Sequence, residues 1–225
     1  MSVSTSRGGA DHRWSLLVPV KRLVGAKTRL ARLAGPHRGD LALAIACDTV
    51  MAAVECPEVA SVFVVTDDAR AAEALRDLGA HIIAGEPGTG LNPALVHGAA
   101  EAVRREPGQG LCALSADLPA LRPAELGAVL AGAARHERAF LADAPGVGTT
   151  LYTAAPGADF APAFEGASRR RHLGAGTVEL TPADVPTVRR DVDTPEDLRE
   201  AVDLGVGPHT AKLLDLVGLL DAPQR

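Results

Sequence analysis

Acidic side chains that could bind a metal ion occur at two places in the chain. Asp117 follows the apolar run 111–114, which is typical of a buried parallel strand, and Pro119 ends any further strand pairing. Because open α/β sheets bind ligands at the carboxyl ends of their strands, a carboxylate there can hold Mg²⁺ against a nucleotide triphosphate. The spacing leaves an alternative equally open, in which Asp117 caps the helix that begins near Pro123 or shapes the turn before it.

The second place is the segment 188–193, VRRDVD, which we expect to form the last strand of the sheet. Asp191 and Asp193 are two residues apart, and on a strand that spacing places both side chains on one face. One of them therefore lies at a strand end, as Asp117 does. Two carboxylates from separate strand ends predict a Mg²⁺ site between them.

Basic side chains follow the first expected strand, 14–20, closely. The loop after this strand holds four cations, Lys21, Arg22, Lys27 and Arg29. It lacks both the GxxxxGKS/T pattern of a P-loop and the GxGxxG pattern of a dinucleotide-binding loop, so a plain Rossmann dehydrogenase is disfavoured. Cations in such a loop can grip phosphates, and the alternative is an ordinary solvated basic loop.

Two other segments could contact a nucleotide or another anion. The loop 85–92, GEPGTGLN, has three glycines, so its backbone could approach a base or ribose at a strand end. Ser168 is expected to cap a helix that continues into the arginines 169–171, where free N–H groups and guanidinium groups attract anions. Each segment has a simpler alternative, since a Gly-rich loop can merely turn and an arginine run can merely be solvated.

Strand and helix patterns alternate along the chain, which is typical of an α/β fold. The expected strands are 14–20, 61–66, 81–84, 111–114, 139–142, 148–153 and 188–193. The expected helices are 40–54 with Asp40 as its N-cap, 69–78 capped by Asp67 and Asp68, 93–105, 123–135, and one that begins with a capping box at Thr194, Pro195 and Asp197.

The 225 residues fit one folded domain with a real core, since 47% of them are hydrophobic and 23% are charged. We divide the chain into a disordered tail at 1–12, a single domain at 13–207 and a helical tail at 208–225. The net charge of −5 argues against nucleic acid as a partner, and no apolar run has membrane length. Three cysteines without a CxxC pair, and the lack of a hydrophobic leader, predict a cytoplasmic protein with reduced thiols.

Six segments in a fixed order resemble one family of enzymes. They are PVKRLVGAKTRLA at 19–31, GTGLNPAL at 88–95, LSADLPAL at 114–121, GTTL at 148–151, FEGASRRRH at 164–172 and DVDTPEDL at 191–198. Over about residues 14–204, the chain looks like the phosphoenolpyruvate / 2-phospho-L-lactate guanylyltransferases of deazaflavin coenzyme F-420 biosynthesis. ADLP and DTPEDL alone also occur in the molybdenum-cofactor nucleotidyltransferases, so the resemblance depends on the combination.

The resemblance implies a fold and a reaction. The fold is a three-layer α/β/α sandwich with a mixed, mostly parallel sheet, similar to the nucleotide-diphospho-sugar transferases of the glycosyltransferase-A-like, Rossmannoid type. In the reaction, the phosphate of phosphoenolpyruvate or 2-phospho-L-lactate attacks the α-phosphorus of GTP and pyrophosphate leaves. With phosphoenolpyruvate, the product is enolpyruvyl-2-diphospho-5'-guanosine.

The resemblance also implies roles for individual residues. Asp117 and Asp193 would hold Mg²⁺ and act in catalysis with Lys27, and Asp191 would lie behind them or pair with a lysine. The nucleotide would be bound by Lys21, Lys27, Arg29, Gly90 and Asn92. The acceptor phosphate would be held by Thr150, Ser168 and the residue after Phe164. That residue is commonly glycine in the family and is Glu165 here, whose carboxylate would repel a phosphate unless it turns away. His172 is expected to be structural or a neighbour of the phosphate.

Several alternatives stay open at this point. A related nucleotidyltransferase that acts on a molybdopterin or a sugar phosphate is the nearest competitor, although no LxGGxSxRMG opening is present. A nucleotide-binding sensor without catalysis is another, although it would lack the metal-binding acids that this chain has. The acceptor is open among phosphoenolpyruvate, 2-phospho-L-lactate and 3-phosphoglycerate. Two further questions stay open. One is whether a downstream transferase takes up a labile product, and the other is whether the protein is a monomer or a homodimer.

Overall fold

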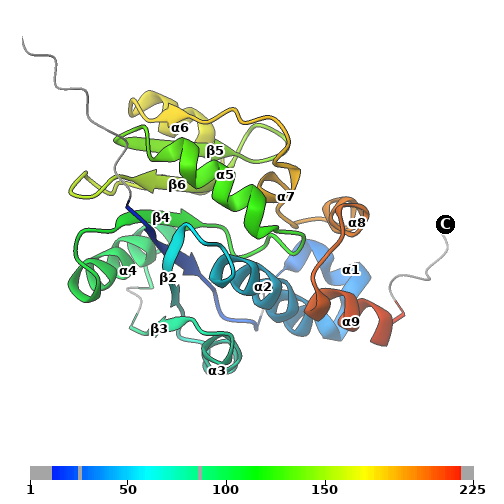
Figure 1. Ribbon diagram of the computed structural model, residues 1–225. Helices are drawn as coiled ribbons and strands as arrows, with labels where there is room; N and C mark the ends of the chain where they lie inside the picture. Colours follow the sequence, from blue (N-terminus) through cyan, green and yellow to red (C-terminus); the bar gives the residue numbers. More distant parts are fainter. Residues whose placement is uncertain (1–11, 25–26, 86–87, 219–225) are drawn as a thin grey trace, which may run out of the picture.

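The computed structural model describes residues 12–24, 27–85 and 88–218, and in this part of the chain a seven-stranded sheet forms the middle layer (Figure 1). The strands are β1 Trp14–Pro19, β2 Val59–Val65, β3 His81–Ile83, β4 Gly110–Leu114, β5 Arg138–Ala142, β6 Thr149–Ala154 and β7 Val178–Glu179. They lie in the order β3-β2-β1-β4-β6-β5-β7. Among these described strands, β6 alone runs antiparallel to its neighbours, β4 and β5. The prediction of a mixed, mostly parallel sheet is therefore confirmed.

Helices cover both faces of this sheet, which gives the three-layer sandwich (Figure 1). One face carries α2 (Arg38–Val54), α3 (Ala69–Asp77) and α5 (Pro123–Ala133), and the other carries α4 (Leu91–Arg105) and α6 (Ser168–Gly174). A further apolar cluster joins α2 to α1 (Ala31–Ala34), α8 (Pro195–Leu204) and α9 (Pro208–Leu216). The short α7 (Pro186–Arg189) lies between α5 and α8 in the fold. No helix in the described ranges is both long and apolar enough to cross a membrane.

The sequence of β1 explains why both faces of the sheet are covered. Leu16 and Val18 pack toward α2 and α5, whereas Leu17 packs toward α4, and all three side chains are fully buried. Apolar side chains in a nearly unbroken run are what a parallel strand covered on both faces requires. The layer of α4 lies close to the sheet because Gly98 has no side chain. A Cβ at Gly98 would stand 2.6 Å from the Val65 side chain.

The expectation of a last strand at 188–193 is wrong. Pro186 begins the short helix α7, as proline commonly does at the first helical position, and the chain then runs without regular structure to Thr194. Asp191 and Asp193 therefore do not share the face of a strand. The capping box that follows is confirmed, since Thr194 and Asp197 each accept a hydrogen bond from the other's backbone N–H.

The predicted caps of α2 and α3 are only partly correct. Asp40 is not the N-cap of α2, because that helix begins earlier, at Arg38, and Asp40 pairs instead with Arg70 at 2.7 Å. Asp68 caps α3 as expected. Asp67 does not cap α3, since its carboxylate accepts a hydrogen bond from the backbone N–H of Gly85 at 2.8 Å.

The two ends of the chain fall partly outside the described residues. The predicted disordered tail at 1–12 lies outside them except for His12, and so do residues 219–225 of the predicted helical tail. Within the helical tail, α9 buries Leu214 in the apolar cluster against α2. This helix is therefore packed on the domain.

Candidate active site

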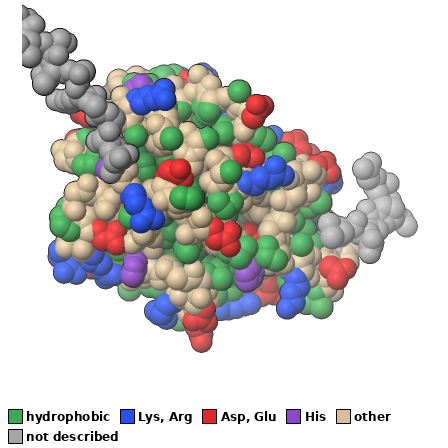
Figure 2. All heavy atoms as spheres, viewed as in Figure 1, with side chains coloured by type: hydrophobic (Ala, Val, Ile, Leu, Met, Phe, Trp, Pro, Cys, Tyr) green, Lys and Arg blue, Asp and Glu red, His purple; other side chains and the backbone are tan. Residues whose placement is uncertain are grey.

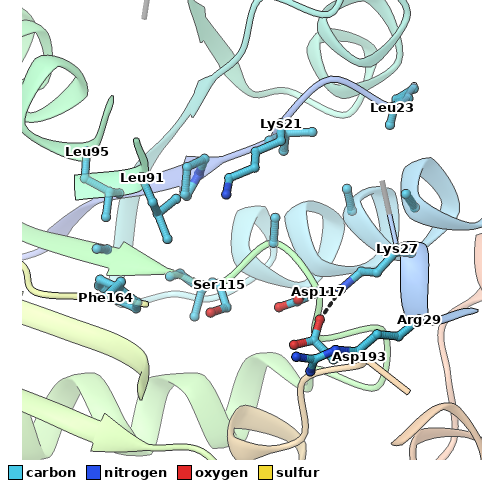
Figure 3. A pocket seen from close by; sticks show the side chains of 17 residues that line it. Lys21, Leu23, Lys27, Arg29, Leu91, Leu95, Ser115, Asp117, Phe164 and Asp193 are labelled. Atoms are coloured by element: carbon cyan, nitrogen blue, oxygen red, sulfur yellow. Dashed lines mark hydrogen bonds and ion pairs between the residues drawn. The ribbon is translucent and has the colours of Figure 1, made fainter. Parts of the chain in front are cut away.

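A cavity of about 510 Å³ opens at the carboxyl ends of β1 and β4 (Figure 3). These two parallel strands are neighbours in the sheet. The strands β2 and β3 lie on one side of β1, and β4 lies on its other side. Ligands bind at such a switch point in open α/β sheets, because a crevice forms where the strand order reverses. The lining comes from the end of β1 and the segment after it, α2, the start of α4, the end of β4 and the loop after it, and the separate residues Phe164 and Asp193.

Two carboxylates and one ammonium group meet at one side of this cavity (Figure 3). The Nζ atom of Lys27 lies 2.6 Å from Oδ2 of Asp117 and 3.2 Å from Oδ1 of Asp193. It also donates a hydrogen bond to the backbone carbonyl of Val192 at 2.5 Å. The fold therefore brings together the two acids that were expected to hold a metal. Asp117 does not cap α5, whose N-cap residue is Arg122.

The charges in this cluster act strongly on one another. Burial on its own would lower the pKa of Lys27, but the charges and hydrogen bonds of Asp117 and Asp193 outweigh burial, and the pKa is raised. Burial raises the pKa of Asp191 to about 7, and the negative charges of Asp117 and Asp193 add to that rise. The carboxylates thus create a negative field in which a cation is favoured.

The basic loop supplies three cations to the cavity. Lys21, Lys27 and Arg29 line it, whereas Arg22 is exposed and is not among the lining residues (Figure 3). Lys27 has a φ of 51°, a left-handed conformation that is uncommon for residues other than glycine and is often found at functional sites. Over the face seen in Figure 2, basic and acidic side chains are interspersed with apolar ones.

The start of α4 and Phe164 form an apolar wall of the cavity. Leu91 and Leu95 of α4 line it together with Phe164. Gly90, at the N-cap of α4, has a φ of 125°, which favours glycine. Asn92 lies beneath this wall, and its side-chain amide accepts a hydrogen bond from the backbone N–H of Phe164 at 2.8 Å and donates one to the carbonyl of Phe164 at 3.1 Å. In this arrangement Asn92 holds the backbone of Phe164 from both its N–H and its carbonyl.

The residues expected to hold the acceptor phosphate are not among those that line the cavity: Thr150 lies on β6, Glu165 before α6 and Ser168 in α6. Thr150 is fully buried, and its hydroxyl has no hydrogen-bond partner among the described residues. Its backbone carbonyl accepts a hydrogen bond from the N–H of Ser115, which lines the cavity. Ser168 is not the N-cap of α6 but its first residue, since the N-cap is Ala167, and its hydroxyl donates to the hydroxyl of Thr149 at 3.0 Å.

Glu165 has a backbone conformation that usually belongs to glycine. Its φ is 82°, in the left-handed region. Its carboxylate is about half exposed and lies 3.9 Å from the Nζ atom of Lys21. The carboxylate therefore faces solvent and a cation, which limits its repulsion of a phosphate.

His172 lies in the core, which agrees with the expectation of a structural role. It is fully buried among the rings of Phe140, Tyr152 and Phe164. Its Nε2 atom accepts a hydrogen bond from the N–H of Ala163 at 2.9 Å, so Nδ1 carries the proton and donates toward Thr149. Burial lowers the pKa of His172 to about 4, and the imidazole is neutral near pH 7.

Sequence reasoning missed the apolar lining of the cavity and the contacts that hold its backbone. Phe164 and Leu91 lie inside the segments that carried the resemblance, but they were not assigned to the cavity. Thr49, in the middle of α2, contacts the backbone beside Asp117 and was given no role. A buried threonine in a helix has no sequence signal that distinguishes such a contact from ordinary packing.

The described sheet and helices have the fold of the nucleotide-diphospho-sugar transferases and cytidylyltransferases. A nucleotide-diphospho-sugar transferase structure from Desulfovibrio desulfuricans G20 superposes with a TM-score of 0.68 at 18% identity, covering 92% of this chain and 96% of that chain. A cytidylyltransferase from Leptospira borgpetersenii superposes with a TM-score of 0.56 at 14% identity, covering 95% of this chain and 99% of that chain. At these identities, the two similarities establish the fold alone.

The chain belongs to the family described as guanylyl transferase CofC like, whose family model matches residues 14–225. It is 57% identical over 204 residues to the phosphoenolpyruvate guanylyltransferase of Streptosporangium roseum, covering 91% of each chain. It is 58% identical over 200 residues to the enzyme of that name from Streptomyces coelicolor, covering 88% of this chain and 94% of that one. The family resemblance found in the sequence motifs is confirmed.

Proposed function

We propose that this protein transfers GMP from GTP to the phosphate of phosphoenolpyruvate and releases pyrophosphate, as a step in coenzyme F-420 biosynthesis. The observation that carries the proposal is the meeting of Asp117, Asp193 and Lys27 at one side of a cavity lined by two further cations. The name of the relatives that are more than half identical to this chain supports phosphoenolpyruvate as the acceptor. 2-Phospho-L-lactate and 3-phosphoglycerate are the competing acceptors.

The chemistry needs positioning and charge neutralisation more than proton transfer. An oxygen of the acceptor phosphate forms a bond to the α-phosphorus of GTP, while the bond from the α-phosphorus to the bridging oxygen of the β-phosphate breaks. The bonding electrons leave with pyrophosphate. The attacking phosphate is already an anion near pH 7, so no general base is required, and the neutral His172 fits this picture. Two anions must be brought together, and Lys21, Lys27 and Arg29 reduce their repulsion.

The donor set around Lys27 fits a hard divalent cation. Three oxygen atoms, from the carboxylates of Asp117 and Asp193 and the carbonyl of Val192, already converge on one positive charge. Magnesium prefers such oxygen ligands and usually takes only one or two carboxylates, completing its shell with water and phosphate oxygens. Among the described residues, no group of three or more His, Cys, Asp or Glu side chains is arranged to hold a metal without such help. We therefore assign Asp117 and Asp193 to Mg²⁺, which when bound would neutralise charge on the phosphates.

The two substrates are assigned to different walls. We place the guanosine against the start of α4, where Gly90 leaves the backbone open and Leu91 and Phe164 offer apolar surface. The acceptor phosphate is assigned to the side of Thr150 and Ser168, supported by the buried, unpartnered hydroxyl of Thr150. Asn92 then supports the nucleotide wall through Phe164. A downstream transferase and a homodimer stay predictions.

Release of pyrophosphate tests this proposal directly. GTP and Mg²⁺ are supplied with phosphoenolpyruvate, 2-phospho-L-lactate or 3-phosphoglycerate in separate reactions, and each acceptor is also tried with ATP, CTP and UTP. We expect release with GTP and phosphoenolpyruvate. Release only with CTP would instead support a related nucleotidyltransferase. Binding of GTP without turnover for any acceptor, even with a coupled enzyme that removes the product, would support a nucleotide sensor and contradict the proposal.

A further inference from the structure

The hydroxyl of Thr49 holds the backbone on both sides of Asp117. Thr49 lies in the middle of α2 with 0% of its surface exposed. Its Oγ1 atom accepts a hydrogen bond from the N–H of Leu118 at 3.0 Å. The same hydroxyl donates to the carbonyl of Ile45 at 2.9 Å and lies 3.3 Å from the carbonyl of Ala116 as a second acceptor. A hydroxyl has one proton and two lone pairs, so these contacts use its proton and one of its lone pairs.

The Leu118 N–H belongs to the same peptide group as the carbonyl of Asp117. That carbonyl accepts a hydrogen bond from the N–H of Val192 at 3.0 Å. Since a peptide group is planar and rigid, the two bonds fix its orientation from opposite ends. One end is tied to α2 through Thr49, and the other is tied to the residue before Asp193. The orientation of this peptide sets where the Asp117 side chain leaves the loop relative to Asp193.

The helix that carries Thr49 is itself anchored on the side away from the cavity. The neighbouring Asp48 accepts hydrogen bonds from the N–H groups of His209 and Thr210, at 2.9 and 2.8 Å, and thereby holds the start of α9. The N–H of Gly207 donates to the carbonyl of Pro119 at 2.8 Å. A Cβ at Gly207 would lie 2.5 Å from the Asp48 carboxylate, so only glycine allows this close approach. The loop 117–119 is thus held from α2 and from α9.

We propose that Thr49 is a positioning residue, whose hydroxyl sets the separation of the Asp117 and Asp193 carboxylates that hold the metal. The inference rests on the proposed function, because it takes these two carboxylates as the metal-binding pair. Partners that orient metal ligands without touching the metal commonly change its affinity by about 10–100-fold when they are removed. A merely structural threonine would change the stability of the protein and leave the metal affinity as it was.

Three variants separate these roles. Thr49→Val keeps the shape and removes the hydroxyl, and Thr49→Ser keeps the hydroxyl. Thr153→Val is the matched control, because Thr153 is equally buried, on β6, and its hydroxyl donates to the carbonyl of Ala139 at 3.2 Å. Three quantities are measured for each variant. The first is the affinity for Mn²⁺ in the presence of GTP, from the electron paramagnetic resonance signal of free Mn²⁺. The others are the metal concentration that gives half-maximal pyrophosphate release and the unfolding temperature.

We expect Thr49→Val to bind Mn²⁺ about 10-fold or more weakly and to need correspondingly more metal for turnover. Thr49→Ser should stay within about 3-fold of the wild type, because its hydroxyl can restore the bond to Leu118. Thr153→Val should lower the unfolding temperature without changing the Mn²⁺ affinity. If Thr49→Val does not fold, Thr49→Ala takes its place, and it should show the same loss of Mn²⁺ affinity because it also removes the hydroxyl that accepts from Leu118.

Equal Mn²⁺ affinity in Thr49→Val and Thr153→Val would overturn the inference, and so would a Thr49→Ser variant as impaired as Thr49→Val. Asp117→Asn in the same Mn²⁺ measurement keeps the two proposals apart. If Asp117→Asn binds Mn²⁺ and GTP as the wild type does, the metal assignment in the proposed function fails. If Asp117→Asn weakens binding and Thr49→Val does not, the role of Thr49 alone fails.

Discussion

Acidification should destabilise the folded protein through His172, by an amount that the structure allows us to work out. The imidazole is fully buried, and burial lowers its pKa from 6.5 to about 4. The unfolded chain therefore binds a proton more readily than the folded chain between these values. Stability is fully present above about pH 6.5 and is lost as the pH falls toward 4. One pKa unit corresponds to about 1.36 kcal/mol, so the total loss in the free energy of unfolding is about 3 kcal/mol. About 2 kcal/mol of this loss falls between pH 7 and pH 5.

The assay is the free energy of unfolding, measured with urea at pH 7, 6 and 5, for the wild type and for His172→Gln. Asp191 acts in the opposite sense, because its pKa is raised to about 7 and the folded chain gains stability as that carboxyl takes up a proton. For each protein we therefore take the change in the free energy of unfolding from pH 7 to pH 5. The decisive quantity is the difference in this change between the wild type and His172→Gln. In that difference the contribution of Asp191 cancels.

We expect the wild type to lose about 2 kcal/mol more than His172→Gln over this interval. His81→Gln is the matched control, because His81 is an exposed histidine on β3, and it should follow the wild type. The reasoning is refuted if His172→Gln and the wild type change equally. It is also refuted if the activity of the wild type follows a group with a pKa near 6.5 that disappears in His172→Gln, since that would make the imidazole a participant in the reaction.

Three further predictions concern the cavity. Lys27→Met should lower kcat/KM about 10²–10³-fold in the pyrophosphate assay, because it removes the charge-assisted hydrogen bonds to Asp117 and Asp193 and the cation that we propose for the phosphates. Lys212→Met, on the exposed side of α9, is the control and should retain activity within about 2-fold. Asp117→Asn should abolish measurable turnover and keep an unfolding temperature near that of the wild type, and substantial turnover would contradict its assignment to the metal. Glu165→Gly should raise the free energy of unfolding, measured with urea, by about 0.5–1 kcal/mol, because glycine adopts the left-handed backbone without strain. The same variant should lower the KM for phosphoenolpyruvate. A loss of stability would contradict the presence of strain at Glu165.

The sequence by itself determined the fold class, the family and most of the site's residue types. Buried strands have nearly continuous apolar sequences because both of their faces are covered, so the strand that ends before Asp117 could be recognised from its own residues. The capping box at Thr194 and Asp197 was equally visible, because both of its hydrogen bonds join residues within one turn. The cations after β1 and the motif with Asp193 then indicated phosphate chemistry without any knowledge of their distances.

Only the tertiary structure decided how these residues meet. The ammonium group of Lys27 lies between Asp117 and Asp193 because three segments far apart in the sequence end at one crevice. The segment 188–193 has the β-branched residues of a strand, but Pro186 starts a short helix there, and the N–H of Val192 pairs with the loop after β4 instead of with a strand. Local sequence patterns report on the backbone within a few residues, whereas such long-range hydrogen bonds depend on how whole elements pack. For the same reason, Thr49 looked like an ordinary buried helix residue until packing placed its hydroxyl against the peptide after Asp117.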